Sequence, residues 1–483
     1  MKLKELLEGV EILRLQADEN MEVRDVRYDS RAVEQGDLFV AIRGFESDGH
    51  AYIPAAVKKG AAVILCEEAP ALDIPYIMVK DARLALALVS CNYFGHPARE
   101  MRIIGITGTN GKTTSTMLLK HVLERSLGAK VGLIGTNQNM IGDEGIPTER
   151  TTPESYELQK LFRRMADEGC THVVMEVSSH SLQLDRVAGF TFAVGAFTNL
   201  TQDHLDFHKT MENYAEAKAL LFSCSERGVV NLDDLWAETM TRGAKCPIFT
   251  YSETKNEADL VAKDIRLSAR GVKFCAVTMG EIARVSLGIP GRFTVYNAMT
   301  VLAVCLQLGI SLEDASAALS DAEGVKGRVE VVPTDGDYTI LIDYAHTPDA
   351  LENVLLSMKE VAEGRVVALF GCGGDRDRTK RPLMGAIAAK CADFVIVTSD
   401  NPRTEEPQAI IDEITAGLAD TNTPYTVICD RREAIAWAID NHQPNDVIIL
   451  AGKGHETYQI IGKTKYPMDE REIVSEHLKN RGE

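Results

Sequence analysis

The segment GITGTNGKTT (105–114) has the residue types and spacing that bind nucleotide phosphates. The apolar run MRIIGIT (101–107) predicts a strand before it, and leucines at 119, 123 and 127 predict a helix after it that ends at Gly128. Successive backbone N–H groups and the helix N-terminus would then point at phosphate oxygens. Lys112 would reach the β- and γ-phosphates, and the Thr113 hydroxyl would coordinate Mg²⁺. The match is not strict, because Ile106 stands where the usual pattern has glycine.

Further along the chain, Glu176 could hold Mg²⁺ beside such a loop, and two other segments carry polar residues of note. Glu176 closes the apolar run in VVMEVSSH (173–180), His204 lies in TNLTQDHLDFH (198–208), and Lys218 lies in the helix-like run YAEAKALLF (214–222). Each has an ordinary alternative: a solvated strand-end carboxylate, a histidine in a polar loop, and a surface lysine. The phosphate loop alone does not distinguish a motor, a kinase, a GTPase and a ligase.

The last third of the chain places its polar and glycine-rich residues after predicted strands. YTILIDYA, RVVALFGC, ADFVIVTS and TPYTVICD alternate with helix-like stretches, and DVIILAG is the last strand. This is a doubly wound α/β pattern, in which ligands bind beyond the carboxyl ends of the strands. The segments found there are 343–346, 371–377, 400–403, 430–432 and 452–456. They predict that this part of the chain carries half of an active site.

These elements divide the chain into three predicted domains. A small mixed α/β domain covers 1–98 and ends near the Gly/Pro-containing segment GHPARE (95–100). A central P-loop ATPase-type domain with a largely parallel sheet covers 99–328, with a small antiparallel patch at 258–290. A Rossmann-like doubly wound domain covers 329–483. The fold class is therefore α/β in three domains.

Composition limits the classes of function. The chain of 483 residues has a formal net charge of −19, which argues against broad binding of nucleic acid or anionic membranes. The ten cysteines form no C-x-x-C pair, which predicts reduced, mostly buried thiols rather than disulfides or a zinc site. Glu5 and Glu8 stand where a signal peptide would be apolar, and no apolar run reaches about 18 residues. We expect a cytoplasmic protein with no membrane span.

Several motifs together resemble the Mur ligases, the ATP-dependent enzymes that extend the peptide stem of the bacterial cell-wall precursor. TGTNGKT, MEVSSH, TNLTQDHLDFH and YAEAKALLF occur in the order typical of that family. The similarity continues in DSRAVEQGDLFVAIRG, GRFTVYNA, DYAHTPDAL, FGCGGDRDRTKRPLM and AGKGHE, and covers essentially the whole chain. The resemblance has one departure: Thr294 stands where close relatives often carry asparagine, and it predicts a difference in the contacts near the adenine.

The resemblance implies a reaction and a set of residues. ATP phosphorylates a substrate carboxylate, giving an acyl phosphate and ADP. An amine then attacks the acyl phosphate and expels phosphate, which leaves an amide. Mg²⁺, in two ions, would be held by Thr113, Glu176, His204 and Lys218, with Lys218 carried as a carbamate. The implied catalytic residues are Lys112, Glu176, His204, Lys218 and His346. The implied ATP contacts are Gly108, Thr109, Asn110, Gly111, Lys112, Thr113, Thr114, Asn297, Arg328 and Asp343. The implied contacts to the UDP-muramoyl-dipeptide are Ser30, Thr151, Thr152, Ser178 and Arg186.

The amino acid that is added would be meso-diaminopimelate or L-lysine, which lacks the distal carboxylate. Diaminopimelate-adding members have the motif found here as Asp400-Asn401-Pro402-Arg403. A guanidinium can pair with the distal carboxylate through two hydrogen bonds, and bound lysine would leave it unpaired. The resemblance adds Arg376 as a second carboxylate contact and Gly452 with Glu456 as the clamp for an ammonium group.

Other functions remain as alternatives. They are a lysine-adding or dual-specificity ligase, a folate polyglutamate synthetase, a P-loop NTPase without ligase activity, and a dinucleotide oxidoreductase. The DSR and GDLFVA segments argue against the synthetase, and Arg376 replaces the last glycine of a dinucleotide motif. We expect a monomer whose partners are small molecules: ATP, UDP-N-acetylmuramoyl-L-alanyl-D-glutamate and meso-diaminopimelate. The two C-terminal domains are expected to close around them, with GVKGRVE (324–330) in the hinge.

Overall fold

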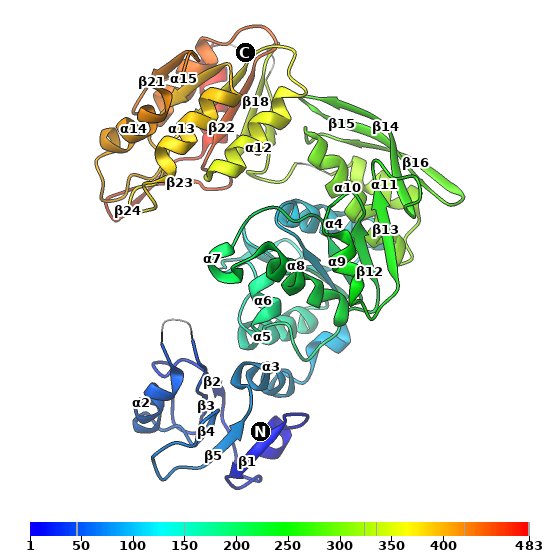
Figure 1. Ribbon diagram of the computed structural model, residues 1–483, viewed down its shortest axis with the longest axis vertical. Helices are drawn as coiled ribbons and strands as arrows, with labels where there is room; N and C mark the ends of the chain where they lie inside the picture. The colour runs from blue at the N-terminus through cyan, green and yellow to red at the C-terminus, as the bar shows by residue number, and fades with distance from the viewer. Residues whose placement is uncertain (45–46, 149, 323, 335, 420, 482–483) are drawn as a thin grey trace. The chain divides into compact units, whose positions relative to one another are not determined.

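A computed structural model describes residues 1–44, 47–148, 150–322, 324–334, 336–419 and 421–481. These residues form two compact units. The first contains residues 1–259 and 300–311, and the second contains 260–299 and 312–483. Figure 1 labels their helices and strands.

The N-terminal part of the first unit is a small mixed sheet with helices. Its strands run in the order β1-β5-β4-β3-β2, and only β1 is antiparallel to its neighbour. Asp81 caps the longest helix here by accepting bonds from the backbone N–H groups of residues 83 and 84. The elements are α1 (Leu3–Leu6), β1 (Ile12–Gln16), β2 (Val26–Arg27), β3 (Leu38–Val40), α2 (Ile53–Lys58), β4 (Val63–Cys66), β5 (Tyr76–Val79) and α3 (Ala82–Tyr93).

The rest of the first unit is a larger sheet that carries the phosphate loop. Strands β13, β12, β11, β6, β10 and β7 are parallel neighbours in that order, and β8 and β9 extend the edge antiparallel. The central strands β6, β10 and β11 are buried almost throughout, as strands covered on both faces must be. The strands are β6 (Arg102–Thr107), β7 (Val131–Ile134), β8 (Asn139–Ile141), β9 (Glu144–Ile146), β10 (His172–Glu176), β11 (Val194–Phe197), β12 (Gly228–Asn231) and β13 (Ile248–Ser252). The helices are α4 (Lys112–Leu127), α5 (Ser155–Asp167), α6 (Ser179–Gln183), α7 (Leu205–His208), α8 (Met211–Ala219) and α9 (Ala237–Arg242).

The second unit begins with an antiparallel meander, which confirms the patch predicted at 258–290. It consists of β14 (Leu260–Ser268), β15 (Gly271–Thr278) and β16 (Glu281–Leu287), against which α11 (Leu312–Ser320) packs. Helix α10 (Arg292–Gln307) contributes residues to both units.

The C-terminal part of the second unit is a six-stranded sheet in the order β17-β18-β22-β19-β20-β21. All neighbours are parallel except the edge strand β17. Helices cover both faces, so the doubly wound prediction is confirmed. The strands are β17 (Glu330–Val332), β18 (Thr339–Asp343), β19 (Val366–Phe370), β20 (Phe394–Val397), β21 (Tyr425–Val427) and β22 (Val447–Ala451), followed by the hairpin β23 (Tyr458–Ile461) and β24 (Thr464–Pro467). The helices are α12 (Pro348–Lys359), α13 (Lys380–Cys391), α14 (Pro407–Thr415), α15 (Arg431–Asp440) and α16 (Glu470–Arg481).

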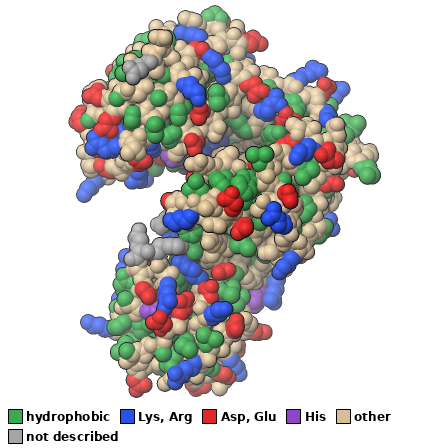
Figure 2. All heavy atoms as spheres, in the orientation of Figure 1, with side chains coloured by type: hydrophobic (Ala, Val, Ile, Leu, Met, Phe, Trp, Pro, Cys, Tyr) green, Lys and Arg blue, Asp and Glu red, His purple; other side chains and the backbone are tan. Residues whose placement is uncertain are grey.

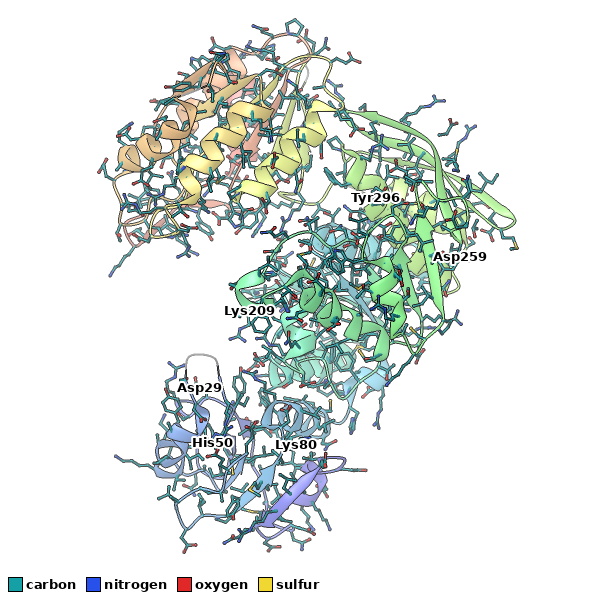
Figure 3. The ribbon with its side chains drawn as sticks, in the orientation of Figure 1. Asp29, His50, Lys80, Lys209, Asp259 and Tyr296 are labelled. Atoms are coloured by element: carbon teal, nitrogen blue, oxygen red, sulfur yellow. The ribbon has the colours of Figure 1, made fainter. Side chains whose placement is uncertain are left out.

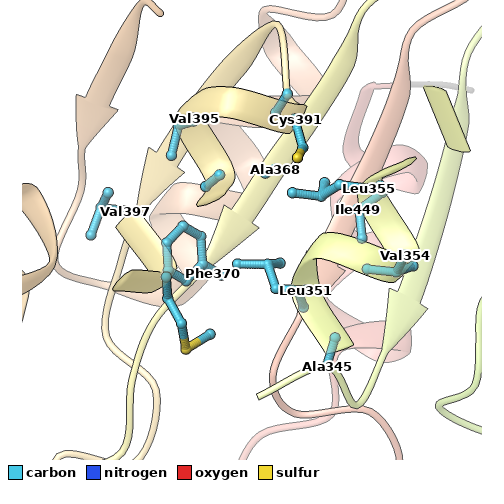
Figure 4. Packing of buried hydrophobic residues seen from close by; sticks show 14 of the residues in the cluster. Ala345, Leu351, Val354, Leu355, Ala368, Phe370, Cys391, Val395, Val397 and Ile449 are labelled. Carbon is cyan, nitrogen blue, oxygen red and sulfur yellow. The ribbon is translucent and has the colours of Figure 1, made fainter. Parts of the chain in front are cut away.

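Apolar packing fixes this sheet between its helices. On one face Leu351 and Leu355 of α12 meet Ala368, Phe370 and other buried strand residues (Figure 4). On the other face α15 and α16 cover a second cluster. Burying such side chains contributes about 1.5–3 kcal/mol each, which holds the strand ends in fixed positions.

Surface and cysteine features agree with the sequence. Acidic and basic side chains are interspersed with apolar ones on the face shown in Figure 2. The ten cysteines are free thiols, six of them buried, as predicted. Within the described part of the chain, no helix is long and apolar enough to cross a membrane.

Candidate active site

The phosphate loop connects β6 to α4 as predicted. Gly108 and Gly111 have φ of +151° and +84°, in the region that favours glycine. A Cβ atom on Gly108 would lie 2.0 Å from Thr198 Oγ1, so this glycine also permits close packing. Helix α4 begins at Lys112, directly after the loop. The opening N–H groups of a helix are those that bind anions, so the first turn, including Thr113 and Thr114, is suited to phosphates.

The segment after β11 holds the loop in this shape. Asn199 accepts a bond from Asn110 N (2.9 Å) and donates Nδ2 to Asn110 O (3.1 Å). Its backbone oxygen accepts from Thr109 N at 2.8 Å. Thr198 Oγ1 donates to Asn110 O at 2.7 Å. These hydrogen bonds therefore hold the backbone of residues 109 and 110 in place.

Two lysines converge on one carbonyl of the loop. Lys112 Nζ donates to Gly108 O (2.9 Å) and Thr109 O (2.8 Å), and Lys218 Nζ donates to Gly108 O at 2.8 Å. Lys218 is only 1% exposed, and burial together with the charge of Lys112 holds its pKa well below the usual value. The lowered pKa favours the neutral amine over the ammonium, and the neutral amine is the nucleophilic form.

Glu176 is the last residue of β10, which pairs with β6. Its carboxylate is held by Thr136, which follows β7. Glu176 is paired with Ile106 in the parallel register, and Thr136 donates to its carboxylate through N (2.9 Å) and Oγ1 (3.0 Å). Glu176 is 1% exposed. Gly135 permits this approach, since a Cβ there would lie 2.6 Å from Glu176 Oε1.

Tyr214 brings the remaining predicted metal ligands together. Its ring centre lies 4.6 Å from Lys218 Nζ and 6.1 Å from the ring of His204, and its hydroxyl lies 3.2 Å from Thr109 Oγ1. His204 has a φ of +52° and lies 3.4 Å from Asp203, Nε2 to Oδ2.

These donors fit Mg²⁺ bound with a nucleotide. Among the described residues, no three His, Cys, Asp or Glu side chains form a cluster that could hold a metal. Mg²⁺ commonly uses one or two protein oxygens and completes its shell with phosphates and water. The Thr113 hydroxyl and the Glu176 carboxylate are oxygens of that kind. A lysine ammonium cannot be a ligand, so Lys218 could join the set only after modification.

Four of the predicted dipeptide contacts lie together beside Glu176. Thr151 Oγ1 lies 3.0 Å from Thr136 Oγ1, and Thr152 Oγ1 donates to the last carbonyl of β10 at 2.8 Å. Ser178 N donates to Thr152 Oγ1 (3.1 Å), and Arg186 donates to Thr152 O (3.3 Å). The predicted residues therefore form one connected polar surface.

Ser30 lies apart from them, in the loop after β2. Within the described residues no hydrogen bond joins it to Thr151 or Thr152. Its loop is tied to the start of α5 by Tyr28, whose hydroxyl donates to Glu157 at 2.9 Å. Figure 3 shows the neighbouring Asp29 on this N-terminal part of the unit.

The predicted ATP contacts of the second unit centre on the end of β18. Asp343 is 8% exposed and accepts bonds from Val329 N and Ala345 N, both at 2.8 Å. Burial raises its pKa, and the charge of Arg328 opposes that rise. His346 is exposed, and its Nδ1 lies 2.8 Å from the Tyr344 oxygen.

Asn297 is buried in the part of α10 that belongs to the second unit, at 3% exposure.

The predicted diaminopimelate contacts meet at the ends of β19, β20 and β22. Asn401 Nδ2 donates to Glu456 Oε2 at 2.9 Å. A Cβ on Gly452 would lie 2.8 Å from Asp400 Oδ2, so those two segments touch. Arg403, with φ of +53°, donates to Gly374 O at 2.7 Å.

Pro402 and Arg376 complete this cluster. A Cβ on Gly374 would lie 1.8 Å from Pro402 O. A Cβ on Gly373 would lie 2.8 Å from Arg403 Nη1 and 3.8 Å from Arg376 Cγ, so both arginines border the same glycine.

Sequence reasoning missed four residues that hold these sites: Thr136, Asn199, Tyr214 and Lys453. Thr136 could have been found, since it follows a predicted parallel strand as the other polar residues do. Asn199 and Tyr214 lie in TNLTQDHLDFH and YAEAKALLF, where the predictions concern His204 and Lys218 instead. No feature of the sequence marks Lys453 as part of a site, apart from its position in GKGHE.

Comparison with known proteins agrees with this geometry. Residues 22–93 match the model "Mur ligase family, catalytic domain", 106–305 match "Mur ligase middle domain", and 327–454 match "Mur ligase, glutamate ligase domain". A UDP-N-acetylmuramoyl-L-alanyl-D-glutamate--2,6-diaminopimelate ligase of Clostridium acetobutylicum is 48% identical over 483 residues, covering 99% of each chain. The enzyme of that name from Caldanaerobacter subterraneus is 49% identical, again over 99% of each chain.

A solved structure gives the same result. The structure of a UDP-N-acetylmuramoyl-L-alanyl-D-glutamate--2,6-diaminopimelate ligase matches with a TM-score of 0.76 and 33% identity, covering 100% of this chain and 99% of the other. Together, the phosphate loop, the polar strand ends and these full-length matches show that the chain belongs to the Mur ligase family.

Proposed function

We propose that the protein joins meso-2,6-diaminopimelate to the D-glutamate of UDP-N-acetylmuramoyl-L-alanyl-D-glutamate, using ATP. The observation that carries this proposal is the cluster of Asn401, Arg403, Gly452 and Glu456 at neighbouring strand ends. It combines a guanidinium for a distal carboxylate with a carboxylate for an ammonium group, as diaminopimelate requires. The full-length relatives carry the name of this reaction.

The first unit supplies groups for phosphate transfer. The first turn of α4 and Lys112 would bind the ATP phosphates, and Mg²⁺ would be held by Thr113 and Glu176. The γ-phosphate would pass to the D-glutamate carboxylate, giving an acyl phosphate and ADP. Thr151, Thr152, Ser178 and Arg186 would hold the dipeptide, and Ser30 the uridine end. Asn297, Arg328, Asp343 and His346 would contact ATP from the second unit.

Lys218 is proposed to carry a carbamate. Its neutral amine would add to CO₂, forming an N–C bond and releasing one proton. The product is an anion that could join His204 and Glu176 around a second Mg²⁺. The lowered pKa of the buried amine supports this step, because only the neutral form reacts.

The chain is proposed to act as a monomer of three domains covering 1–98, 99–328 and 329–483. The separate family matches support three domains, and sedimentation of the purified protein at several concentrations would reveal a dimer if one formed.

Phosphate release tests the proposed reaction directly. ATP, Mg²⁺ and the UDP-muramoyl-dipeptide are supplied with meso-diaminopimelate, with L-lysine, or with neither. Release only with diaminopimelate is expected. Equal release with lysine would contradict the role of Arg403 and favour the dual-specificity alternative. Release without any amino acid would favour an NTPase and overturn the ligase.

A further inference from the structure

Lys453 is a fully buried lysine at the centre of the proposed amino-acid site. Its side chain is 0% exposed. Its ammonium lies 3.0 Å from Glu456 Oε2 and 3.2 Å from Asn401 Oδ1. Burying a charge without partners is costly, so these two contacts keep the ammonium in place.

The ammonium determines how both partners face the site. Asn401 Oδ1 accepts from Lys453 and from Ile460 N (2.8 Å), which directs its Nδ2 toward Glu456. Glu456 Oε2 then accepts from both Asn401 Nδ2 (2.9 Å) and Lys453 Nζ. Both bonds fall on Oε2, and neither of them uses Oε1.

Hydrogen bonds from two arginine side chains hold the backbone next to Lys453 in place. Arg431 donates to Ala451 O at 2.9 Å and pairs with Glu470, and both of these charged side chains are 0% exposed. Arg471 donates to Gly454 O at 2.9 Å. These bonds fix the residues on either side of Lys453.

We propose that Lys453 is a positioning residue for the incoming amino acid. It acts through Glu456 and Asn401, fixing one oxygen of the carboxylate and presenting the other to the amino group of the substrate. Its loss would weaken amino-acid binding and leave ATP binding unchanged. The inference rests on the proposed function, because it assigns the same pocket to an amino acid.

The test measures KM for each substrate in Lys453→Met, using the phosphate-release reaction. We expect the KM for diaminopimelate to rise about tenfold or more, and the KM for ATP and for the UDP-muramoyl-dipeptide to stay within about twofold. Lys465→Met is the matched control, because Lys465 lies over the same Tyr458 ring (4.1 Å, against 5.7 Å for Lys453) but is exposed. Its kinetics should match the wild type. An unchanged KM for diaminopimelate, or an equal rise for all three substrates, would overturn the inference.

A double variant covers the case in which Lys453→Met does not fold. Lys453→Met/Glu456→Gln removes both charges, which leaves no unpaired carboxylate. If Lys453 acts through Glu456, the double variant should have the same KM for diaminopimelate as Glu456→Gln alone. A further rise of about tenfold in the double variant would show that Lys453 acts independently and would overturn the inference. Wild-type protein without amino-acid-dependent release would contradict the proposed function itself, separately from either variant.

Discussion

Arg403 occupies a backbone position that few arginines adopt. Its φ of +53° lies in the left-handed region, which costs a residue with a Cβ about 1–2 kcal/mol. Its backbone N donates to Ile460 O (3.0 Å), and its guanidinium donates to Gly374 O (2.7 Å). Gly373 leaves room for that guanidinium, since a Cβ there would lie 2.8 Å from Nη1. The local strain is therefore offset by bonds that hold one orientation of the side chain.

Replacing Arg403 with methionine should remove selection for diaminopimelate. We expect kcat/KM for diaminopimelate to fall about a hundredfold or more, because the distal carboxylate would lose a charged partner that can form two hydrogen bonds with it. The value for L-lysine should change far less, so the ratio of the two kcat/KM values is the measurement. Arg432→Met is the control, an exposed arginine at the start of α15. A ratio that stays constant in Arg403→Met would assign selectivity to another residue.

Lys218 should carry a carbamate whose occupancy falls as pH falls. Its lowered pKa keeps the amine neutral, and therefore reactive toward CO₂, to lower pH than an exposed lysine. Below that pKa the ammonium forms and the carbamate is lost. Carbon-13 NMR of protein equilibrated with labelled bicarbonate should show a signal that decreases on acidification.

Two variants assign that signal. Lys218→Met should abolish it. Lys120→Met should retain it, because the buried ammonium of Lys120 is bonded to both carboxylate oxygens of Glu124 at 2.8 Å. A carbamate signal that survives Lys218→Met would place the modification elsewhere.

At the scale of elements, the long helices and buried strands could be predicted because periodicity and strand length are local properties. Helix α4 ends at Leu127, with Gly128 at φ +60° as its C-cap, as the leucine spacing and the glycine indicated. The edge strands β8 and β9 and the hairpin of β23 and β24 were not predicted. They are short and mixed in composition, and their pairing depends on tertiary context.

The same distinction holds for the site. Polar residues at the ends of parallel strands could be predicted to meet, because the topology brings those ends to one edge. Lys453 could not, since its burial depends on partners at 401 and 456 whose side-chain directions the sequence does not specify. Thr136 is an intermediate case, a strand-end residue whose target, Glu176, is forty residues away in the chain.

Gly128→Ala should destabilise the protein by about 1 kcal/mol in denaturant unfolding. A Cβ at position 128 would meet no atom within 4 Å, so a clash with neighbouring atoms does not explain the loss of stability. The cost comes from the left-handed backbone conformation of Gly128, which disfavours a residue with a Cβ. Gly243 is a matched control: it caps α9 with φ of −107°, and its Cβ would also enter open space. Gly243→Ala should be neutral or slightly stabilising. Equal effects of the two substitutions would mean that backbone conformation does not determine the cost.

At the scale of the whole molecule, the groups proposed for the two chemical steps belong to different units. Lys112, Glu176 and Lys218 belong to the first unit. The side chains that would select the amino acid, Arg403 and Glu456, belong to the second. The predicted ATP contacts occur in both units, whereas the residues predicted to select the amino acid occur only in the second.

This division predicts that the two steps can be separated by mutation. Hydroxylamine can replace the amino acid as the nucleophile and convert an acyl phosphate into a stable hydroxamate. Arg403→Met should form hydroxamate from ATP and the UDP-muramoyl-dipeptide at close to the wild-type rate, because neither the phosphate groups nor the dipeptide contacts are altered. Lys112→Met should lose hydroxamate formation, since the transferred phosphate loses its charged partner. Loss of hydroxamate in both variants would mean that the amino-acid pocket must be intact before phosphate moves. The second unit would then control the first chemical step as well as the identity of the product.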